Sequence, residues 1–119
     1  MKSSTNSTAS EARLSKKVLL LENIHSSAKE NFQKMGFTVQ AETSSFNEDE
    51  LLKVLPEYNV LGIRSKTQLS EKLLKACPRL EAIGCYCIGT NQVALSAATD
   101  MGAAVFNAPY SDGIIMFIN

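Results

Sequence analysis

Residues 82–92 read AIGCYCIGTNQ, and the rest of the chain is organised around this run. Its apolar first part is typical of a strand buried within a parallel sheet, where both faces are covered. The run then breaks at Gly89 into small polar residues, which suit a turn that leads into a helix. A glycine at the end of a strand lets a ligand approach the backbone, whose amide groups can hold an anion. The same pattern fits an ordinary strand-to-helix turn, and spacing alone leaves both interpretations open.

The composition indicates one globular domain without a charged or lipid partner. The chain has 119 residues, of which 45% are hydrophobic and 20% are charged. Its 12 basic and 12 acidic side chains balance, so we expect neither nucleic acid nor an acidic membrane surface as a partner. No apolar run approaches the ~18 residues of a membrane span, and no secretory segment is visible near the start. We therefore expect a cytoplasmic protein.

The three cysteines, Cys77, Cys85 and Cys87, do not form a disulfide framework, because their number is odd and their spacing fits none. Cys85 and Cys87 are two residues apart in a predicted strand and so share one face. A metal site would need more ligands, and the only histidine, His25, is distant in sequence. Buried structural thiols are therefore favoured over a metal-binding or redox pair, and we expect no metal.

Strands and helices alternate along most of the chain. Residues 1–16 are rich in Ser and Thr and predict a disordered tail, with a transit peptide as the alternative. Apolar runs then predict strands near 17–21, 37–41, 60–63 and 103–106, besides the strand that begins at residue 82. Helical patterns lie between them, at about 26–35, 45–55, 70–77 and 95–101. This order predicts an α/β fold, with a parallel five-stranded sheet and helices on both faces.

Polar residues follow three of these strands, at Arg64-Ser65, Ile88-Gly89 and Asn107. The carboxyl ends of parallel strands share one edge of a sheet, so these residues are expected to come together. Arg64 supplies a fork of donors for carboxylate or phosphate, Ser65 a hydroxyl, and Gly89 a backbone amide. Each residue taken alone also fits a surface, capping or turn position. Together they predict half of a pocket for a small anion.

Three motifs carry a resemblance to a known family. They are GIRSKT at 62–67, IGCYCIGTNQV at 83–93 and VFNAPYS at 105–111. In this order and spacing they resemble the D-3-phosphoglycerate dehydrogenases, within the D-isomer-specific 2-hydroxyacid dehydrogenases, and especially the fungal and bacterial branch with a CFCIGTNQ core. The resemblance covers about residues 17–111 and implies the first part of a flavodoxin-like substrate-binding domain.

The resemblance also implies which residues line the hydroxyacid pocket. They are Arg64, Ser65, the amides of Ile88 and Gly89, and Asn107. In the family, the enzyme oxidises 3-phosphoglycerate with NAD in serine biosynthesis, and the cofactor is held by a separate nucleotide-binding domain. These roles are expectations for the present chain.

The sequence departs from the family pattern in several places. Tyr86 stands where Phe is usual, and Ala94 stands where an Asp would cap a helix, a loss of about 1 kcal/mol. Residues 112–119 diverge where the family continues into a helix that crosses to the nucleotide domain. No Gly-x-Gly-x-x-Gly motif and none of the family's catalytic Arg, Glu and His are found, and His25 lies outside the matching motifs.

These departures predict a truncated phosphoglycerate dehydrogenase substrate domain. We expect it to lack catalytic residues and a cofactor of its own, to bind a small anionic substrate weakly, and to be inactive alone. One alternative is a non-catalytic small-anion-binding or regulatory module that docks onto a full-length paralogue. Another is a gene fragment without a selected function. The sequence leaves these alternatives open.

The last residues form an apolar segment, GIIMFI at 113–118, with strong β propensity and no charge. Such a segment is a candidate for edge-to-edge pairing when it is exposed. We therefore expect the chain to self-associate through this tail. The alternative is that the tail folds back onto the domain, although the pattern specifies no groove to receive it.

Overall fold

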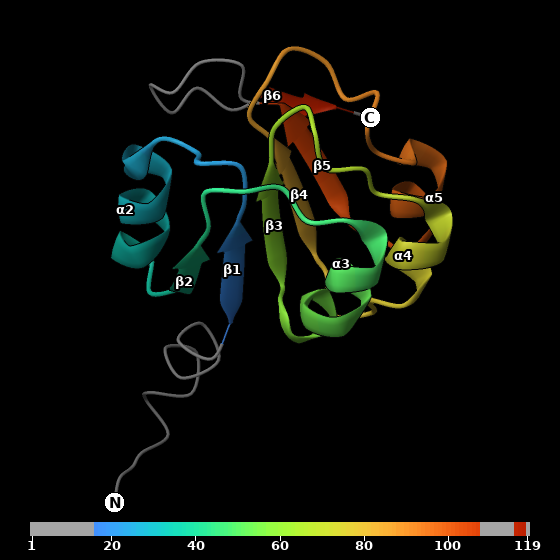
Figure 1. Ribbon diagram of the computed structural model, residues 1–119, viewed down its shortest axis with the longest axis horizontal. Coiled ribbons are helices and arrows are strands. Elements are labelled where there is room, and N and C mark those ends of the chain that lie inside the picture. Colours follow the sequence, from blue (N-terminus) through green and yellow to red (C-terminus); the bar gives the residue numbers. More distant parts are fainter. Residues whose placement is uncertain (1–15, 108–115, 119) are drawn as a thin grey trace, which may run out of the picture.

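The computed structural model describes residues 16–107 and 116–118. Apart from Lys16, the predicted disordered tail lies outside the described residues, as do residues 108–115. The described chain forms one sheet, in the order β2-β1-β3-β4-β5-β6 (Figure 1). The strands are β1 (Lys17–Leu20), β2 (Thr38–Ala41), β3 (Val60–Ile63), β4 (Ala82–Cys85), β5 (Ala104–Asn107) and β6 (Met116–Ile118). The first five strands pair in parallel in the flavodoxin-like order, which confirms the predicted fold class.

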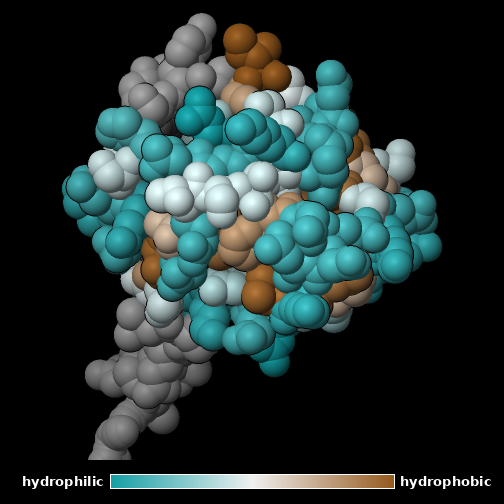
Figure 2. All heavy atoms as spheres, in the orientation of Figure 1, coloured by the Kyte–Doolittle hydropathy of each residue, from teal (hydrophilic) through white to brown (hydrophobic). Residues whose placement is uncertain are grey.

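The helices cover both faces of the sheet, as predicted (Figure 1). They are α2 (Ser26–Lys34), α3 (Glu48–Val54), the 3-10 helix η2 (Leu55–Glu57), α4 (Glu71–Lys75) and α5 (Leu95–Asp100). Helix α2 packs on one face near β1, whereas α3, α4 and α5 contribute to the larger core on the other. None of the helices that the structure describes is long and apolar enough to cross a membrane. The face seen in Figure 2 is largely hydrophilic, with hydrophobic residues in scattered patches.

The larger core is built on one row of side chains that crosses four strands. The register pairs Leu19 with Leu61, Leu61 with Ile83, and Ile83 with Val105. All four side chains are buried, and those of Leu61 and Ile83 are fully inaccessible to solvent. Such rows arise because successive side chains of a strand point to opposite faces, so paired residues lie on the same face.

The neighbouring row on the opposite face contains two glycines, which make room for aromatic rings. Gly62 pairs with Gly84, and Gly84 pairs with Phe106. A Cβ atom on Gly84 would lie 2.7 Å from the Phe106 ring and 3.0 Å from the Tyr86 ring. The two strands therefore carry glycine where the rings pack against the backbone.

Three helices differ in how their amino ends are capped. Asn47 and Glu50 form a reciprocal capping box at α3, with N···O distances of 2.8 and 2.9 Å. At α4 the Ser70 hydroxyl accepts from the Leu73 N–H. At α5 the capping position is Ala94, which has no side chain that can accept a hydrogen bond. The expected loss of this cap is confirmed.

Ala94→Asp is therefore expected to raise the free energy of unfolding by about 1 kcal/mol, because a carboxylate there can accept an orphan N–H of α5. Urea denaturation of both proteins measures the difference. Ser96→Asp is the matched control, since it adds the same charge within the first turn but not at the cap. Equal stabilisation by the two substitutions would show that charge alone, and not capping, is responsible.

Strand β6 extends the sheet beyond the predicted five strands. It pairs antiparallel with β5, with Phe106 opposite Phe117 and Asn107 opposite Met116. The described part of the apolar tail thus folds back onto the domain, which was the alternative outcome for this segment. Self-association through the tail stays a prediction.

Candidate functional site

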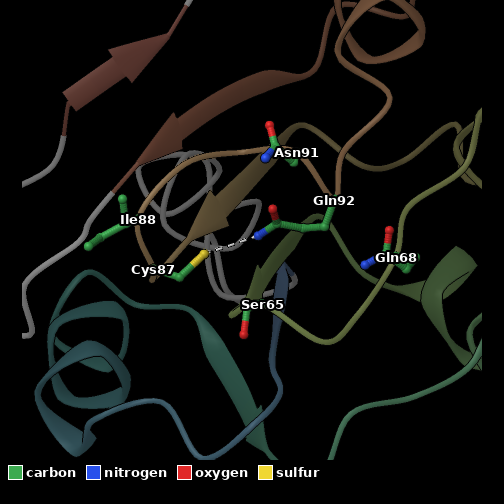
Figure 3. A pocket seen from close by; sticks show the side chains of 6 residues that line it. All are labelled: Ser65, Gln68, Cys87, Ile88, Asn91 and Gln92. Carbon is green, nitrogen blue, oxygen red and sulfur yellow. Dashed lines mark hydrogen bonds between the residues drawn. The ribbon is translucent and has the colours of Figure 1, made fainter.

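A hollow of about 230 Å³ lies at the carboxyl edge of the sheet, where the predicted site residues were expected. Ser65, Gln68, Cys87, Ile88, Asn91 and Gln92 line it (Figure 3). Two of the five predicted residues, Ser65 and Ile88, are among them. Arg64 and Gly89 are their direct neighbours in sequence, and Asn107 contacts the same turn from β5. The structure therefore brings the three predicted segments to one place.

The turn after β4 exposes its backbone. The Ile88 side chain is 93% exposed, and Gly89 has a φ of 87°, in the left-handed region that favours glycine. Neither N–H of these two residues donates to another residue that the structure describes. The position of a Cβ on Gly89 is also open, with nothing within 4 Å. Within the described part of the chain, both amides thus remain without an acceptor.

Asn107 holds this turn in place from the end of β5. Its Nδ2 donates to the carbonyl oxygens of Cys85, Cys87 and Gly89, at 2.9, 2.6 and 3.4 Å. These contacts fix the path of the chain from β4 into the exposed turn. The predicted role of Asn107 as a ligand group stays a prediction, and the structure gives it a second role in shaping the site.

Gln92 joins the turns that follow β3 and β4. Its side chain is buried, and Nε2 donates to the Arg64 carbonyl at 2.7 Å and to the Cys87 sulfur at 3.1 Å. Figure 3 shows the Gln92 and Cys87 side chains pointing toward each other, while the Ile88 side chain points away from them. The family motif contained Gln92, but sequence alone did not indicate this bridging contact.

Arg64 and Ser65 are both exposed at the start of the loop that follows β3. Within the described part of the chain, the Arg64 guanidinium forms no ion pair. Its planar fork is therefore free to pair with a carboxylate or phosphate on a ligand.

Glu22 is a further residue that the sequence prediction missed. Its carboxylate accepts hydrogen bonds from the backbone N–H groups of Arg64, Lys66 and Thr67, at 2.9, 2.9 and 3.0 Å. The residue is buried, with only 9% of its surface exposed to solvent. Burial raises the pKa of the Glu22 carboxyl, but the donors from Lys66, Arg64 and Thr67 outweigh burial and hold the pKa below its ordinary value. The available signal was an acid directly after the first buried strand, at the edge where Arg64 lies.

The lowered pKa predicts how acid affects stability. Since the folded pKa of Glu22 lies below 4.5, its contribution is complete above that pH and is lost as the pH falls through the folded pKa. In urea unfolding from about pH 6 to about pH 2, the stability difference between wild type and Glu22→Gln should shrink toward acid. Glu42→Gln, which removes a carboxylate that accepts from the Gln40 side chain, is the control. A difference that stays constant across this range would contradict the prediction.

The thiols and the lone histidine have structural surroundings. Burial raises the pKa of Cys77, and burial with a smaller effect of Cys87 raises that of Cys85 to about 12. Cys77 and Cys85 are thus buried, neutral thiols, as favoured from the sequence. The prediction was wrong for Cys87, which lies beyond the end of β4 and is only half-buried in the lining of the hollow. The described residues contain no group of three or more His, Cys, Asp or Glu side chains that could hold a metal ion. The His25 ring accepts from the Ser27 N–H at the start of α2.

Comparison with known proteins identifies the family. The model of the catalytic domain of D-isomer specific 2-hydroxyacid dehydrogenases matches residues 18–114. The chain belongs to this family. The resemblance found in the three sequence motifs is therefore confirmed, and it extends over most of the described fold.

Within this family, the chain is similar to enzymes named D-3-phosphoglycerate dehydrogenase. The chain is 49% identical over 94 residues to D-3-phosphoglycerate dehydrogenase of Dictyostelium discoideum, covering 79% of this chain and 23% of that protein. It is 40% identical over 97 residues to the enzyme of the same name from Escherichia coli K12, covering 81% and 24%. The chain thus spans about a quarter of the length of these curated relatives.

Solved structures share the fold at lower sequence identity. An NAD+-bound 3-phosphoglycerate dehydrogenase from Entamoeba histolytica aligns with a TM-score of 0.68 and 19% identity, covering 78% of this chain and 32% of that one. D-lactate dehydrogenase from Escherichia coli aligns with a TM-score of 0.64 and 19% identity, covering 79% and 31%. These likenesses concern the fold.

Proposed function

We propose that this family member forms the substrate-binding part of a phosphoglycerate dehydrogenase and binds the carboxylate of 3-phosphoglycerate at the turn after β4. The observation that carries the proposal is the exposed Ile88-Gly89 turn, whose two N–H groups have no acceptor among the described residues. Gln92 joins this turn to the Arg64 backbone, and the Arg64 guanidinium forms no ion pair with any described residue. Identity of 40–49% to D-3-phosphoglycerate dehydrogenases supports the choice of substrate.

The chemistry of this edge suits a small carboxylic acid with a neighbouring hydroxyl. Two backbone N–H groups offer hydrogen bonds to one carboxylate, and the Arg64 guanidinium adds a charge-assisted pair. Ser65 supplies a hydroxyl that both donates and accepts. Because the hollow is open and its lining side chains are neutral, we expect millimolar affinity, about −4 kcal/mol.

The described residues do not fit a dinucleotide cofactor. A pyrophosphate cradle needs glycines whose missing side chains leave space for phosphate at the start of a helix. Here Gly62 and Gly84 lie inside strands, and their spaces are occupied by the side chains of Leu20, Phe106 and Tyr86. Gly89 has open space, but it is the single glycine of the turn between β4 and α5, where a cradle needs several. We therefore derive no hydride-transfer step for this chain, and propose that the 119 residues do not by themselves reduce NAD with 3-phosphoglycerate.

The location of the protein is proposed to be the cytoplasm, since its three cysteine thiols are free.

Titration of the ¹⁵N-labelled chain with 3-phosphoglycerate tests the proposal. The amide signals of Ile88 and Gly89 should move with a Kd of about 1 mM. Arg64→Ala should weaken binding about tenfold or more, because the charge-assisted pair is lost. Arg79→Ala is the matched control, since Arg79 is an exposed arginine that precedes β4 at the opposite edge of the sheet. Ile88 and Gly89 signals that stay fixed while others shift would overturn the assignment.

A further inference from the structure

The carboxyl edge of this sheet contains an anion that belongs to the chain itself. In flavodoxin-like sheets the ligand crevice lies where the strand order reverses, which here is between β1 and β3. The Glu22 carboxylate crosses this position and accepts three N–H groups of the loop after β3. Three convergent backbone N–H groups form a nest of the type that binds phosphate or carboxylate ligands.

The backbone is shaped to bring Glu22 to this place. Glu22 and Asn23 have φ values of 64° and 56°, in the left-handed region that non-glycine residues rarely adopt. Both are held there by backbone bonds, from the Glu22 N–H to the Ser44 carbonyl and from the Asn23 N–H to the Glu42 carbonyl. Asparagine adopts this conformation readily, but a glutamate does so only where its surroundings fix it, and such residues cluster at functional sites.

The Arg64 peptide is consequently fixed from both sides. Its N–H donates to the Glu22 carboxylate at 2.9 Å, and its carbonyl accepts from the Gln92 side chain at 2.7 Å. The guanidinium is bound to no acidic group of the described residues. Fixing the backbone while leaving the side chain unpaired is the arrangement expected of a ligand-binding arginine, since less freedom is lost when a ligand binds.

We propose that Glu22 is a positioning residue for the substrate site: as a built-in anion it fills the nest formed by Arg64, Lys66 and Thr67 and thereby sets the place of Arg64 and Ser65. The carboxylate of a ligand thus binds at the Ile88-Gly89 turn, because the nest formed by the loop after β3 is already occupied by Glu22. This inference rests on the proposed function for its binding consequence, whereas the order of the loop is a property of the free chain.

Two substitutions separate the charge from the shape of the side chain. In Glu22→Gln the isosteric amide keeps one oxygen, so at least one of the three N–H groups loses its acceptor. Glu22→Ala leaves all three without a partner and opens a space the size of a small carboxylate. Glu42→Gln is the matched control, a nearby carboxylate that accepts from the Gln40 side chain and not from the loop.

Amide hydrogen exchange by NMR on the full chain measures the order of the loop. Exchange at one or more of Arg64, Lys66 and Thr67 should accelerate at least about tenfold in Glu22→Gln, and at all three in Glu22→Ala, with core amides such as Leu61 unchanged. Sodium formate, compared with sodium chloride at equal ionic strength, should slow exchange again in Glu22→Ala and leave wild type unchanged. This rescue tests the nest directly, because a role confined to packing would not respond to formate.

Binding is measured separately, with 3-phosphoglycerate on wild type and Glu22→Gln. A Kd increase of about tenfold or more in Glu22→Gln, with Glu42→Gln equal to wild type, is expected. The proposal would be overturned if amide exchange in the loop is unchanged in Glu22→Gln. It would also be overturned if exchange accelerates in a folded Glu22→Ala and formate does not slow it again. If wild type binds no 3-phosphoglycerate, the proposed function fails, and the exchange and formate results still decide the role of Glu22. If Glu22→Ala does not fold, loop exchange in Glu22→Gln decides it.

Discussion

Leu61→Ala is expected to lower the free energy of unfolding by about 2–5 kcal/mol, a large fraction of the stability of a domain of this size. Leu61 is fully buried in β3 and is paired in register with Leu19 on one side and Ile83 on the other. Removing its side chain leaves a cavity in the larger core, on the face of the sheet. Strand β3 is hydrogen-bonded on both sides, so its backbone has little freedom to close this cavity. Urea denaturation followed by circular dichroism measures the loss.

The control for this truncation is Leu95→Ala, which removes the same atoms from the first turn of α5, where the side chain is 38% exposed. We expect a loss below about 1 kcal/mol there, because less apolar surface leaves a buried environment. Equal losses at the two positions would mean that the row through Leu61 is not the centre of the core.

Asn107→Asp is expected to be comparably severe, with a loss of at least about 3 kcal/mol at neutral pH. The substitution keeps the shape of the side chain but replaces the donating Nδ2 by an oxygen. That oxygen would face the carbonyl groups of Cys85 and Cys87, which now accept from Asn107 at 2.9 and 2.6 Å. Acceptors facing one another in a half-buried place repel, and the exposed turn that Asn107 shapes should lose its fixed conformation.

The pH dependence of this variant identifies the cause. Repulsion raises the folded pKa of the introduced carboxyl, so the part of the penalty that is due to charge should shrink as the pH falls through that pKa and be absent below the unfolded value of about 3.9. A smaller loss remains there, because a neutral carboxyl has one O–H where the amide has two N–H groups. Asn91→Asp introduces the same charge at an exposed position on the same hollow and is expected to have little effect. A pH-independent loss in Asn107→Asp would argue that geometry rather than charge is responsible.

Most of the fold was predictable from local patterns. Val60–Ile63 was predicted as a strand with the bounds that the structure gives, because a short apolar run between polar residues has few other solutions. Ala94 correctly indicated that α5 lacks a side-chain cap, because capping depends on residues only a few positions apart. Regular alternation of strands and helices was then enough to predict the parallel sheet.

The network inside the site was not predictable in the same way. Glu22 contacts Thr67 across 45 positions of sequence, and Gln92 contacts Arg64 across 28. Which of several polar side chains at a sheet edge points inward depends on backbone conformation, here the left-handed residues after β1. Such a conformation is favoured by glycine or asparagine, so a glutamate gives no warning of it.

The apolar tail illustrates a second limit. Residues 116–118 carry β propensity, which the sequence showed, but propensity does not choose between pairing with the same chain and pairing with another. In the structure β6 lies antiparallel against β5. Its pairing depends on tertiary structure, namely on the edge of β5 to which it can hydrogen-bond.

The strand order also determines which strand edges of the nascent chain stay unpaired during translation. Strand β1 lies between β2 and β3, and its register pairs Val18 with both Val39 and Val60. Translation at about 5–20 residues per second leaves the β3-facing edge of β1 without its partner for about 2–8 s after β1 is made. During that interval the nascent chain presents an unpaired apolar strand to other chains and to chaperones. The speed of translation across residues 21–60 therefore sets how long this protein is open to aggregation before its first three strands can join.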